Sequence, residues 1–531
     1  MNDTNPSVDR ARELARDLFG HDDLLPGQQE AIEALLEGDD VLLVSATGSG
    51  KSLVYQLPAA LQGGLTLVVS PLLALQSDQL EGLPPALRDR GARLSSDQSR
   101  SERESTLDRA EELLFVVLAP EQLANEEVRR RLRAARPARA VVDEAHCVST
   151  WGHDFRPDYV RLGQLLTELG EQGAPQLLAL TATAAPPVRR DITERLGMRD
   201  PEVVVTGFAR DNISLTVERC TDEDQQHERV AERVRTTEGP GLVYARTRRA
   251  AEEYAALVAA EGKRSAVYHA GRRAAERRDV HRRWLEGDLD VVCATSAFGM
   301  GIDKPDVRYV VHAQVPESVD TYYQELGRAG RDGDPADAVL LYRPEDLALG
   351  RFFAGGVPRE DDVRRVLEAR AEVTDRAEVA RRAELGTRRA GRVLNLMREV
   401  VDQEEEVSVE AVLERAQARR RLERSRVDMM RAYAEGDGCR MAFVLGYFGE
   451  AVDAPCGRCD RCRAGEGALP PGDEVSYPVG QPVTHTAFGT GIVVADEVGG
   501  RTEQVTVLFD DHGYRTLDVA VVHQQGLLRP A

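Results

Sequence analysis

A glycine-bearing turn between a short apolar run and an amphipathic segment has the residue types that bind phosphate. Val41–Val44 has the length of a buried parallel strand, and the turn Thr47–Gly50 follows it. Lys51 and Ser52 then open a segment with leucines at helical spacing. Backbone N–H groups converge at such a helix start, where Lys51 can reach the outer phosphates and Ser52 can hold Mg²⁺. The first glycine of the strict pattern would fall at Ser45, so an ordinary glycine-rich turn is the alternative.

Two adjacent carboxylates end another apolar run, ARAVVDEAH at 138–146. In α/β proteins, ligands bind at the carboxyl ends of parallel strands, where Asp143 and Glu144 are expected. Asp143 would hold Mg²⁺ through its water shell, and Glu144 would polarise the water that attacks a phosphate. A solvated acidic loop is the alternative, and the phosphate loop upstream weighs against it.

The run QELGRAGR, from Gln324 to Arg331, places Arg328 and Arg331 on one side of a helix or turn. Arginine is always charged and can donate two hydrogen bonds at once, which suits phosphate. An arginine that a second domain brings to a γ-phosphate typically raises the rate of hydrolysis by about 10³ to 10⁵. A pair of surface salt bridges is the alternative.

The cysteines form a second constellation. Cys456, Cys459 and Cys462 have the spacing C-x-x-C-x-x-C, and Cys439 precedes them. Four thiolates make a closed tetrahedral zinc site, which is structural because no position is left for water. Disulfides are the alternative, disfavoured in the reducing cytoplasm that the cysteine usage suggests. The remaining cysteines stand alone, and we interpret them as small buried residues.

Strand-like runs alternate with helical stretches on both sides of residue 208, which predicts two successive α/β domains with parallel sheets. The chain divides as 1–208, 209–345, 346–470 and 471–531. The third segment is helical and rich in Arg and Glu. A solvated bundle is one interpretation, and a helix-turn-helix within 383–410, with Gly386 in the turn and 402–409 as a wing, is the other. The last segment alternates apolar and polar residues, as in a small antiparallel barrel.

The length and composition limit the classes of function that this protein can have. The 531 residues exceed what one core holds, and the net charge of −21 argues only weakly against nucleic acid, because binding depends on local patches. No apolar run approaches the ~20 residues of a membrane span, and the N-terminus lacks a secretory signal. We therefore expect a cytoplasmic protein without a membrane partner.

Together these motifs resemble a superfamily-2 helicase, and most closely the RecQ family. The resemblance runs through LPGQQEAI (25–32), ATGSGKS (46–52), DEAHCVSTWGHDFRPDY (143–159), ATSAFGMGIDKPDVR (294–308) and YYQELGRAGRDG (322–333). CRMAFVLGYFGE (439–450) resembles the zinc module of that family.

Three features depart from the family pattern. Leu25 and Thr150 replace the usual residues, and no winged-helix domain follows the zinc module. The end of the chain resembles the small barrel of UvrD/PcrA-type helicases.

The resemblance implies two RecA-like domains, a helical zinc-binding domain and an SH3-like β-barrel. It also implies roles for individual residues. ATP would be held by Gln28, Thr47, Gly48, Ser49, Gly50, Lys51, Ser52 and Asp303. Catalysis would use Lys51, Asp143, Glu144, Arg331, Arg328 and Gln324. DNA would lie along Ser70, Pro71, Trp151, His153, Phe155, Arg156, Arg246 and Thr295. His146, Thr181 and Thr183 would couple the two sites.

The sequence thus predicts an ATP-dependent 3′→5′ DNA helicase or translocase that uses ATP, Mg²⁺ and Zn²⁺ and acts in repair or recombination. Its partners would be single-stranded and partially duplex DNA, with a nucleoid-associated location. Residues 471–531 could dock RNA polymerase or a repair factor. The alternatives are an RNA-stimulated ATPase, and a transcription or repair adaptor in which the terminal barrel is the main functional part.

Overall fold

The computed structural model divides the chain into two compact units, residues 1–208 with 299–303, and residues 209–298 with 304–531. It describes residues 6–46, 48–71, 73–149, 159, 161–170, 175–299, 304–353, 356–373, 375–402, 407–450, 452–467, 477–478, 481–497, 504–510 and 512–531. None of the helices among them combines the length and apolarity needed to cross a bilayer.

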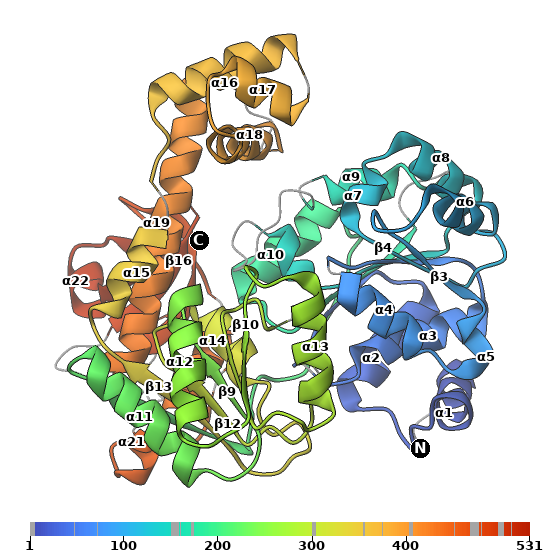
Figure 1. Ribbon diagram of the computed structural model, residues 1–531. Coiled ribbons are helices and arrows are strands. Elements are labelled where there is room, and N and C mark those ends of the chain that lie inside the picture. Colours follow the sequence, from blue (N-terminus) through green and yellow to red (C-terminus); the bar gives the residue numbers. More distant parts are fainter. Residues whose placement is uncertain are drawn as a thin grey trace. The chain divides into compact units, whose positions relative to one another are not determined.

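The first unit is a parallel sheet with helices on both faces (Figure 1). The strand order is β3-β4-β2-β5-β6-β1-β7. The strands are β1 (Val41–Val44), β2 (Thr66–Val69), β3 (Gly91–Leu94), β4 (Phe115–Leu118), β5 (Arg139–Val142), β6 (Gln176–Thr181) and β7 (Glu202–Val205). The helices are α1 (Pro6–Phe19), α2 (Pro26–Glu37), α3 (Lys51–Gln62), α4 (Leu73–Glu81), α5 (Pro85–Arg88), α6 (Arg100–Asp108), α7 (Pro120–Leu123), α8 (Glu126–Ala134), the 3₁₀ turn η1 (Ala145–Val148), α9 (Leu162–Thr167) and α10 (Pro186–Leu196).

The order of this sheet determines which motifs can meet. β1 pairs with β6 in register, Val44 opposite Thr181, and β5 pairs with β6 on its other side. The carboxyl ends of these neighbouring strands therefore lie at one edge. The phosphate loop follows β1, the acidic pair follows β5 and Thr181 ends β6, so the sheet gathers the three motifs there.

The second unit begins with another parallel sheet, of order β10-β11-β9-β12-β13-β8. Its strands are β8 (Ile213–Arg219), β9 (Gly241–Tyr244), β10 (Ser265–Tyr268), β11 (Val291–Ala294), β12 (Tyr309–His312) and β13 (Ala336–Tyr342). Its helices are α11 (Glu223–Thr236), α12 (Arg248–Ala260), α13 (Ala274–Leu285), α14 (Val319–Leu326) and α15 (Asp346–Phe353). The two parallel sheets confirm the prediction of two successive α/β domains.

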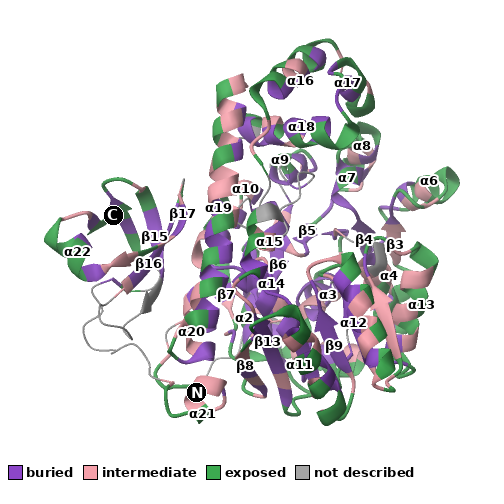
Figure 2. Ribbon diagram, turned by 60° about the vertical axis from the view of Figure 1, so that its left-hand side comes forward, coloured by how far each residue is buried: buried purple, intermediate pink, exposed green. Residues whose placement is uncertain are grey.

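A helical part follows in the second unit. It comprises α16 (Glu360–Glu372), α17 (Arg376–Arg382), α18 (Thr387–Asp402), α19 (Val409–Glu435), α20 (Arg440–Tyr447) and α21 (Asp460–Arg463). α16, α17 and α18 share an apolar core with the first half of α19, formed by residues such as Val363, Val379, Val393 and Val412. The second half of α19 lies beside α15 and the terminal sheet (Figures 1 and 2).

The terminal segment is an antiparallel sheet of order β17-β16-β15-β14-β18 with its own apolar core. Its elements are β14 (Pro482–His485), β15 (Gly489–Glu497), β16 (Gln504–Phe509), β17 (Gly513–Asp518), α22 (Val519–Gln524) and β18 (Leu528–Pro530). The antiparallel sheet agrees with the prediction. Its ladder among the described residues runs from β17 at one edge to β18 at the other, so closure into an SH3-like barrel is not confirmed.

This sheet is fastened to the helical part along β17, the strand nearest α19 in Figure 2. The Tyr514 amide donates to Ser425 Oγ on α19 at 3.0 Å, and the Tyr514 hydroxyl donates to the Tyr447 hydroxyl on α20 at 2.8 Å. The Tyr447 hydroxyl in turn donates to Asp320 on α14. Ser425, Tyr514, Tyr447 and Asp320 are all buried. Burial raises the pKa of both tyrosines, so they stay protonated and can donate. β17 is therefore an integral part of the second unit's packing.

Replacing Gly513 by alanine should destabilise this packing. Gly513 has φ +68°, and a Cβ there would lie 2.4 Å from Ser425 Oγ. Gly489 is a matched control, because its φ is +74° and an added Cβ meets nothing within 4 Å. We expect Gly513→Ala to lower the free energy of unfolding by about 2 kcal/mol more than Gly489→Ala, since overpacking adds to the same backbone strain. Urea unfolding measures the difference, and equal losses would contradict the close packing of β17.

Candidate nucleotide and zinc sites

The phosphate loop has the predicted strand-turn-helix form. Gly48 and Gly50 have φ +84° and +68°, backbone angles that side-chain-bearing residues rarely adopt, and α3 begins directly at Lys51. The Lys51 ammonium donates to the carbonyl oxygens of Ser45 and Ala46 at 2.9 and 3.0 Å. It therefore lies over the loop, where a phosphate would be bound.

Gln28 on α2 supports this loop. Its Nε2 donates to the carbonyl oxygens of Ser49 and Gly50 at 2.8 and 3.2 Å, and its Oε1 accepts from the Leu25 amide at 3.0 Å. A Cβ at Gly50 would lie 2.8 Å from that Nε2, and the φ of +68° at this position favours glycine. The expected contact of Gln28 with ATP remains a prediction, and the structure ties this side chain to the phosphate loop.

The acidic pair lies at the end of β5. Asp143 accepts from Gln79 Nε2 at 2.7 Å and from the Glu144 amide at 3.0 Å. Burial raises the pKa of Asp143, and the charge of nearby Lys51 opposes that rise. Burial and the charge of Asp143 raise the pKa of Tyr55 on α3, and a hydrogen bond with Ser52 opposes that rise. A carboxylate and a hydroxyl oxygen are donors that Mg²⁺ accepts, so the residues present fit this ion. Gln79 is a site residue that the sequence reasoning did not single out.

Glu144 occupies a strained position. Its φ is +49°, which is uncommon for a residue with a side chain and recurs at functional sites. Its Oε2 lies 3.4 Å from Nδ1 of buried His146, and that Nδ1 is 3.0 Å from Thr181 Oγ1. Thr181 Oγ1 also contacts the Thr183 carbonyl at 3.0 Å. A polar chain therefore runs from Glu144 to the end of β6.

The structure describes some of the residues expected to contact DNA, while others lie outside its described part. Ser70 is buried at the end of β2, directly before Pro71, and its carbonyl accepts from Gln76 Nε2 at 2.9 Å. Thr295 follows β11 and Arg246 follows β9. Arg246 forms an ion pair with Glu317, and burial lowers the pKa of its guanidinium. The predicted residues outside the described part of the chain are Thr47, Trp151, His153, Phe155, Arg156 and Asp303.

In the second unit, the loop after α14 carries the two candidate arginines. Arg328 is buried, and Gly330 between them has φ +55°. Arg210 donates from its two terminal nitrogens to the carbonyl oxygens of Gly327 and Ala329, at 3.0 and 2.9 Å. Asn212 Nδ2 donates to the carbonyl of Gly330 at 2.6 Å. Arg210 and Asn212 thus fix the arginine loop, and the sequence reasoning missed both.

Replacing Asn212 by alanine should impair hydrolysis while leaving nucleotide binding intact. The Asn212 amide holds two backbone carbonyls, those of Gly330 and Asp334, and without it the arginine loop loses its fixed position. We expect kcat of DNA-stimulated ATP hydrolysis to fall about ten-fold, since small misplacements of catalytic groups have effects of that size or larger. The KM for ATP should stay unchanged.

The neighbouring exposed Asp211 offers the control, because Asp211→Ala removes a side chain of similar size and leaves the loop braced. Equal kcat values for the two variants would contradict the positioning role of Asn212.

The four predicted zinc ligands come together. One sulfur from each of Cys439, Cys456, Cys459 and Cys462 lies within 4.8 Å of the others. The Cys456 and Cys462 sulfurs are 3.9 Å apart, close to the ~3.8 Å that tetrahedral Zn–S bonds of ~2.3 Å produce. Hydrogen bonds from Cys439 and Cys456 lower the pKa of Cys459. The donor set and its geometry fit Zn²⁺, as predicted.

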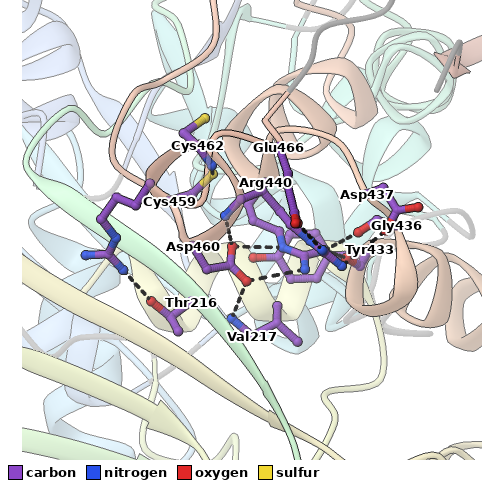
Figure 3. Close-up of polar contacts among 12 residues, drawn as sticks. Thr216, Val217, Tyr433, Gly436, Asp437, Arg440, Cys459, Asp460, Cys462 and Glu466 are labelled. Atoms are coloured by element: carbon purple, nitrogen blue, oxygen red, sulfur yellow. Dashed lines mark hydrogen bonds and ion pairs between the residues drawn. The ribbon is translucent and has the colours of Figure 1, made fainter.

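Residues beside the cysteine cluster contact β8 of the second sheet (Figure 3). Arg440, buried at the start of α20, pairs with Asp460 at 3.1 Å and donates to the Tyr433 carbonyl. Asp460 also accepts from the Val217 amide on β8 at 3.2 Å. Because Asp460 stands between Cys459 and Cys462, a metal held there would also secure the contact with β8.

Known proteins match the chain over most of its length. The DEAD/DEAH box helicase family matches residues 25–191, the helicase conserved C-terminal domain residues 226–333, and the RecQ zinc-binding family residues 394–463. Among solved structures, Mycobacterium smegmatis helicase Lhr bound to ssDNA and AMP-PNP has a TM-score of 0.52 at 23% identity, covering 74% of this chain and 57% of that one. Saccharomyces cerevisiae Dbp5 bound to RNA and ADP BeF3 has a TM-score of 0.51 at 18% identity, covering 64% and 88%. At these identities the structures establish the fold alone.

These matches define a DEAD/DEAH box helicase core of two tandem RecA-like domains, with a zinc-binding domain. The probable ATP-dependent DNA helicase RecS of Bacillus subtilis is 37% identical over 451 residues, 84% of this chain and 89% of that relative. The ATP-dependent DNA helicase RecQ of the same organism is 33% identical over 456 residues, 85% and 67%. RecQ of Haemophilus influenzae is 32% identical over 455 residues, of which this chain covers 63%. The chain belongs to the RecQ family.

Proposed function

We propose that this protein is an ATP-dependent 3′→5′ DNA helicase or translocase that acts in DNA repair or recombination. Membership of the RecQ family carries the proposal, together with a phosphate loop and an acidic pair at neighbouring strand ends. The polarity and the repair or recombination setting follow from the family resemblance. A cytoplasmic, nucleoid-associated location belongs to the same proposal.

The proposed cycle uses residues from both units. The phosphate loop binds the triphosphate, and Lys51 turns from the Ser45 and Ala46 carbonyls to the outer phosphates. Mg²⁺, when bound by Ser52 and Asp143, would neutralise phosphate charge. Glu144 orients the attacking water. Arg331 of the second unit, with Arg328 and Gln324, reaches the γ-phosphate on closure, and hydrolysis reopens the units so that the protein steps along DNA.

A strand-displacement assay tests this proposal. Forked, 3′-tailed and 5′-tailed DNA duplexes are incubated with the full chain, with and without ATP. The proposal requires ATP-dependent displacement of forked and 3′-tailed substrates and none of the 5′-tailed one. Displacement of the 5′-tailed substrate alone would overturn the polarity, and no displacement of any substrate would overturn helicase activity.

The runner-up activity is an RNA-stimulated ATPase, since the fold is shared with Dbp5, whose structure contains RNA. Single-stranded DNA and RNA of one sequence separate the two activities. We expect stimulation of ATP hydrolysis by the DNA. Stronger stimulation by the RNA would favour the runner-up.

We also propose that residues 471–531 dock a protein partner, RNA polymerase or a repair factor. The support is the resemblance of VTHTAFGTGIVV and VLFDDHGYRTL to the barrel that ends UvrD/PcrA-type helicases. Since β17 packs on α19, a partner would bind elsewhere on the sheet, and Arg529 on β18 is exposed. Loss of association with purified RNA polymerase in an Arg529→Glu variant that still unwinds DNA would support docking. Failure of the unchanged protein to bind RNA polymerase would reject that partner.

A further inference from the structure

The helices α16, α17 and α18 form a subdomain that the nucleotide and zinc sites do not use. α17 has the length of a first helix of a helix-turn-helix, residues 383–386 form the turn, and α18 is the longer second helix. Gly386 lies in the turn, as predicted, and the left-handed residue there is Glu384, with φ +53°. The expected wing at 402–409 lies largely outside the described residues, and its described ends belong to α18 and α19 or adjoin them.

Buried side-chain contacts fix the orientation of α18 in this subdomain. Ala390, Val393 and Leu396 of α18 pack into the core shared with α16, α17 and α19. Buried Glu399 accepts from Arg415 and Arg419 of α19, each at 2.8 Å. The apolar contacts hold one face of α18 inward and leave Arg388 and Arg392 on the opposite face. Glu399 follows Arg388 by eleven residues and so has the same helical phase, which means that α19 covers the opposite face only at the C-terminal end of α18.

Charge is distributed unevenly over this subdomain. On α16 and α17, most arginines are paired within the helices, such as Arg364 with Glu360 at 2.6 Å and Arg382 with Glu378 at 3.1 Å. Arg389 of α18 pairs with Asp362 of α16. By contrast, Arg376, Arg388 and Arg392 are exposed and form no ion pair with any residue that the structure describes.

The unpaired arginines belong to one surface. Arg388, Arg392 and half-buried Asn395 follow at helical spacing along α18. Gly391 lies among them, and a Cβ there would lie 2.3 Å from a terminal nitrogen of Arg376. The Arg376 guanidinium therefore rests on α18 at Gly391, next to Arg388 and Arg392. We call Arg376, Arg388, Arg392 and Asn395 the α18 surface.

We propose that the α18 surface binds duplex DNA, with α18 in the major groove. The major groove of B-DNA is about 12 Å wide and admits a helix, and arginine binds both phosphates and guanine edges. Arg376, at the start of the preceding helix, then contacts the DNA backbone, which positions α18. The partner is duplex DNA because A-form RNA has a narrow major groove that side chains cannot read. The inference rests on the proposed function only because both assume that the nucleic acid is DNA. It adds a binding site for duplex DNA that is separate from the residues expected to contact a single strand.

In a forked substrate, the α18 surface would bind the duplex part, where the two strands are still paired. A motor that pulls one strand needs a second hold on the duplex if the strands are to separate efficiently. Among the described residues after the zinc ligands, the elements are the strands of the antiparallel sheet and α22. The α18 surface precedes the zinc ligands in sequence. The α18 surface supplies the duplex contact from a different place in the chain.

The test compares two double charge reversals in the full chain. Arg388→Glu with Arg392→Glu alters the α18 surface. Arg364→Glu with Arg370→Glu makes the same change of net charge on α16, where both side chains are exposed and already engaged, with Glu360 and the Val373 carbonyl. Affinity for a short blunt DNA duplex is measured by fluorescence anisotropy over a range of salt concentrations, without ATP. The same-length RNA duplex is a second probe.

We expect the α18 variant to bind the DNA duplex about ten-fold or more weakly than the unchanged protein, with a salt dependence reduced by about 2 in log–log slope. The α16 variant should bind as the unchanged protein does. Equal affinities of the two variants, or stronger binding of the RNA duplex by the unchanged protein, would overturn the proposal.

ATP hydrolysis stimulated by single-stranded DNA is measured on the same preparations and should survive in both variants, which also shows that they are folded. Its absence from the unchanged protein would defeat the proposed function while leaving the duplex result to decide the α18 surface. A conservative pair, Arg388→Lys with Arg392→Lys, should retain duplex binding because the charge is kept. Loss of binding in that pair together with loss of ATPase activity would indicate misfolding and overturn the assignment of these side chains to an exposed surface.

Discussion

Replacing Lys51 by alanine should abolish DNA-stimulated ATP hydrolysis while single-stranded DNA binding is largely retained. The Lys51 ammonium lies over the phosphate loop, where it donates to the Ser45 and Ala46 carbonyls, and its charge also acts on Asp143. Removing one preorganised donor from a site of developing negative charge typically lowers kcat by about 10²–10³. Steady-state ATPase assays with saturating single-stranded DNA measure this loss.

The chain provides a matched control. Lysine occurs only at positions 51, 263 and 304, and Lys263 lies in the turn between α12 and β10 of the second unit. Lys263→Ala makes the same chemical change away from the phosphate loop and should hydrolyse ATP normally. If Lys51→Ala keeps its ATPase activity, or if both variants lose it equally, the assignment of residues 45–52 to nucleotide binding is wrong.

Replacing Cys459 by alanine should release the metal and unfold the region around it. Cys459 is fully buried, and its sulfur accepts from the Cys462 amide at 3.4 Å. Structural zinc contributes about 10–16 kcal/mol of apparent folding free energy in small zinc-dependent modules. The contacts of Asp460 with Arg440 and Val217 depend on the same loop, so we expect a large fall in melting temperature and loss of bound zinc by metal analysis.

Cys220→Ala is the control for this experiment, because Cys220 is also buried but lies outside the cluster. It should keep zinc at the level of the unchanged protein. A chelator strong enough to remove the metal should reproduce the effect of Cys459→Ala. A Cys459→Ala protein that retains zinc and its melting temperature would show that the cluster does not hold a structural metal.

The sequence predicted most of the fold because its signals are local. Buried parallel strands such as β1, β4 and β11 are continuous apolar runs, and those were found. β3 and β8 were missed, since both lie at sheet edges, where polar residues such as Arg93 and Glu218 interrupt the pattern. The cysteine cluster was predicted because metal ligands must recur at short spacing, and the structure confirms that the four sulfurs meet.

The parts of the site that were missed depend on contacts without a sequence pattern. Arg210 and Asn212 bind main-chain carbonyls more than a hundred positions away. Every residue has such a carbonyl, so the sequence does not indicate which ones are bound. Gln79 was not singled out because its partner, Asp143, is brought near only by the order of the sheet. In the turn before α18, the left-handed residue is Glu384, which no sequence pattern indicates.

The length of α19 has a mechanical consequence. Its 27 residues contain neither glycine nor proline and form one unbroken helix of about 40 Å. One end belongs to the core of the arginine-bearing subdomain, and the other contacts α15, α20 and the strand that begins at Gly513. A straight helix of this length bends little. A force on the subdomain of α16, α17 and α18 would therefore be transmitted along α19 to its other end, next to α20 and the zinc-binding cysteines.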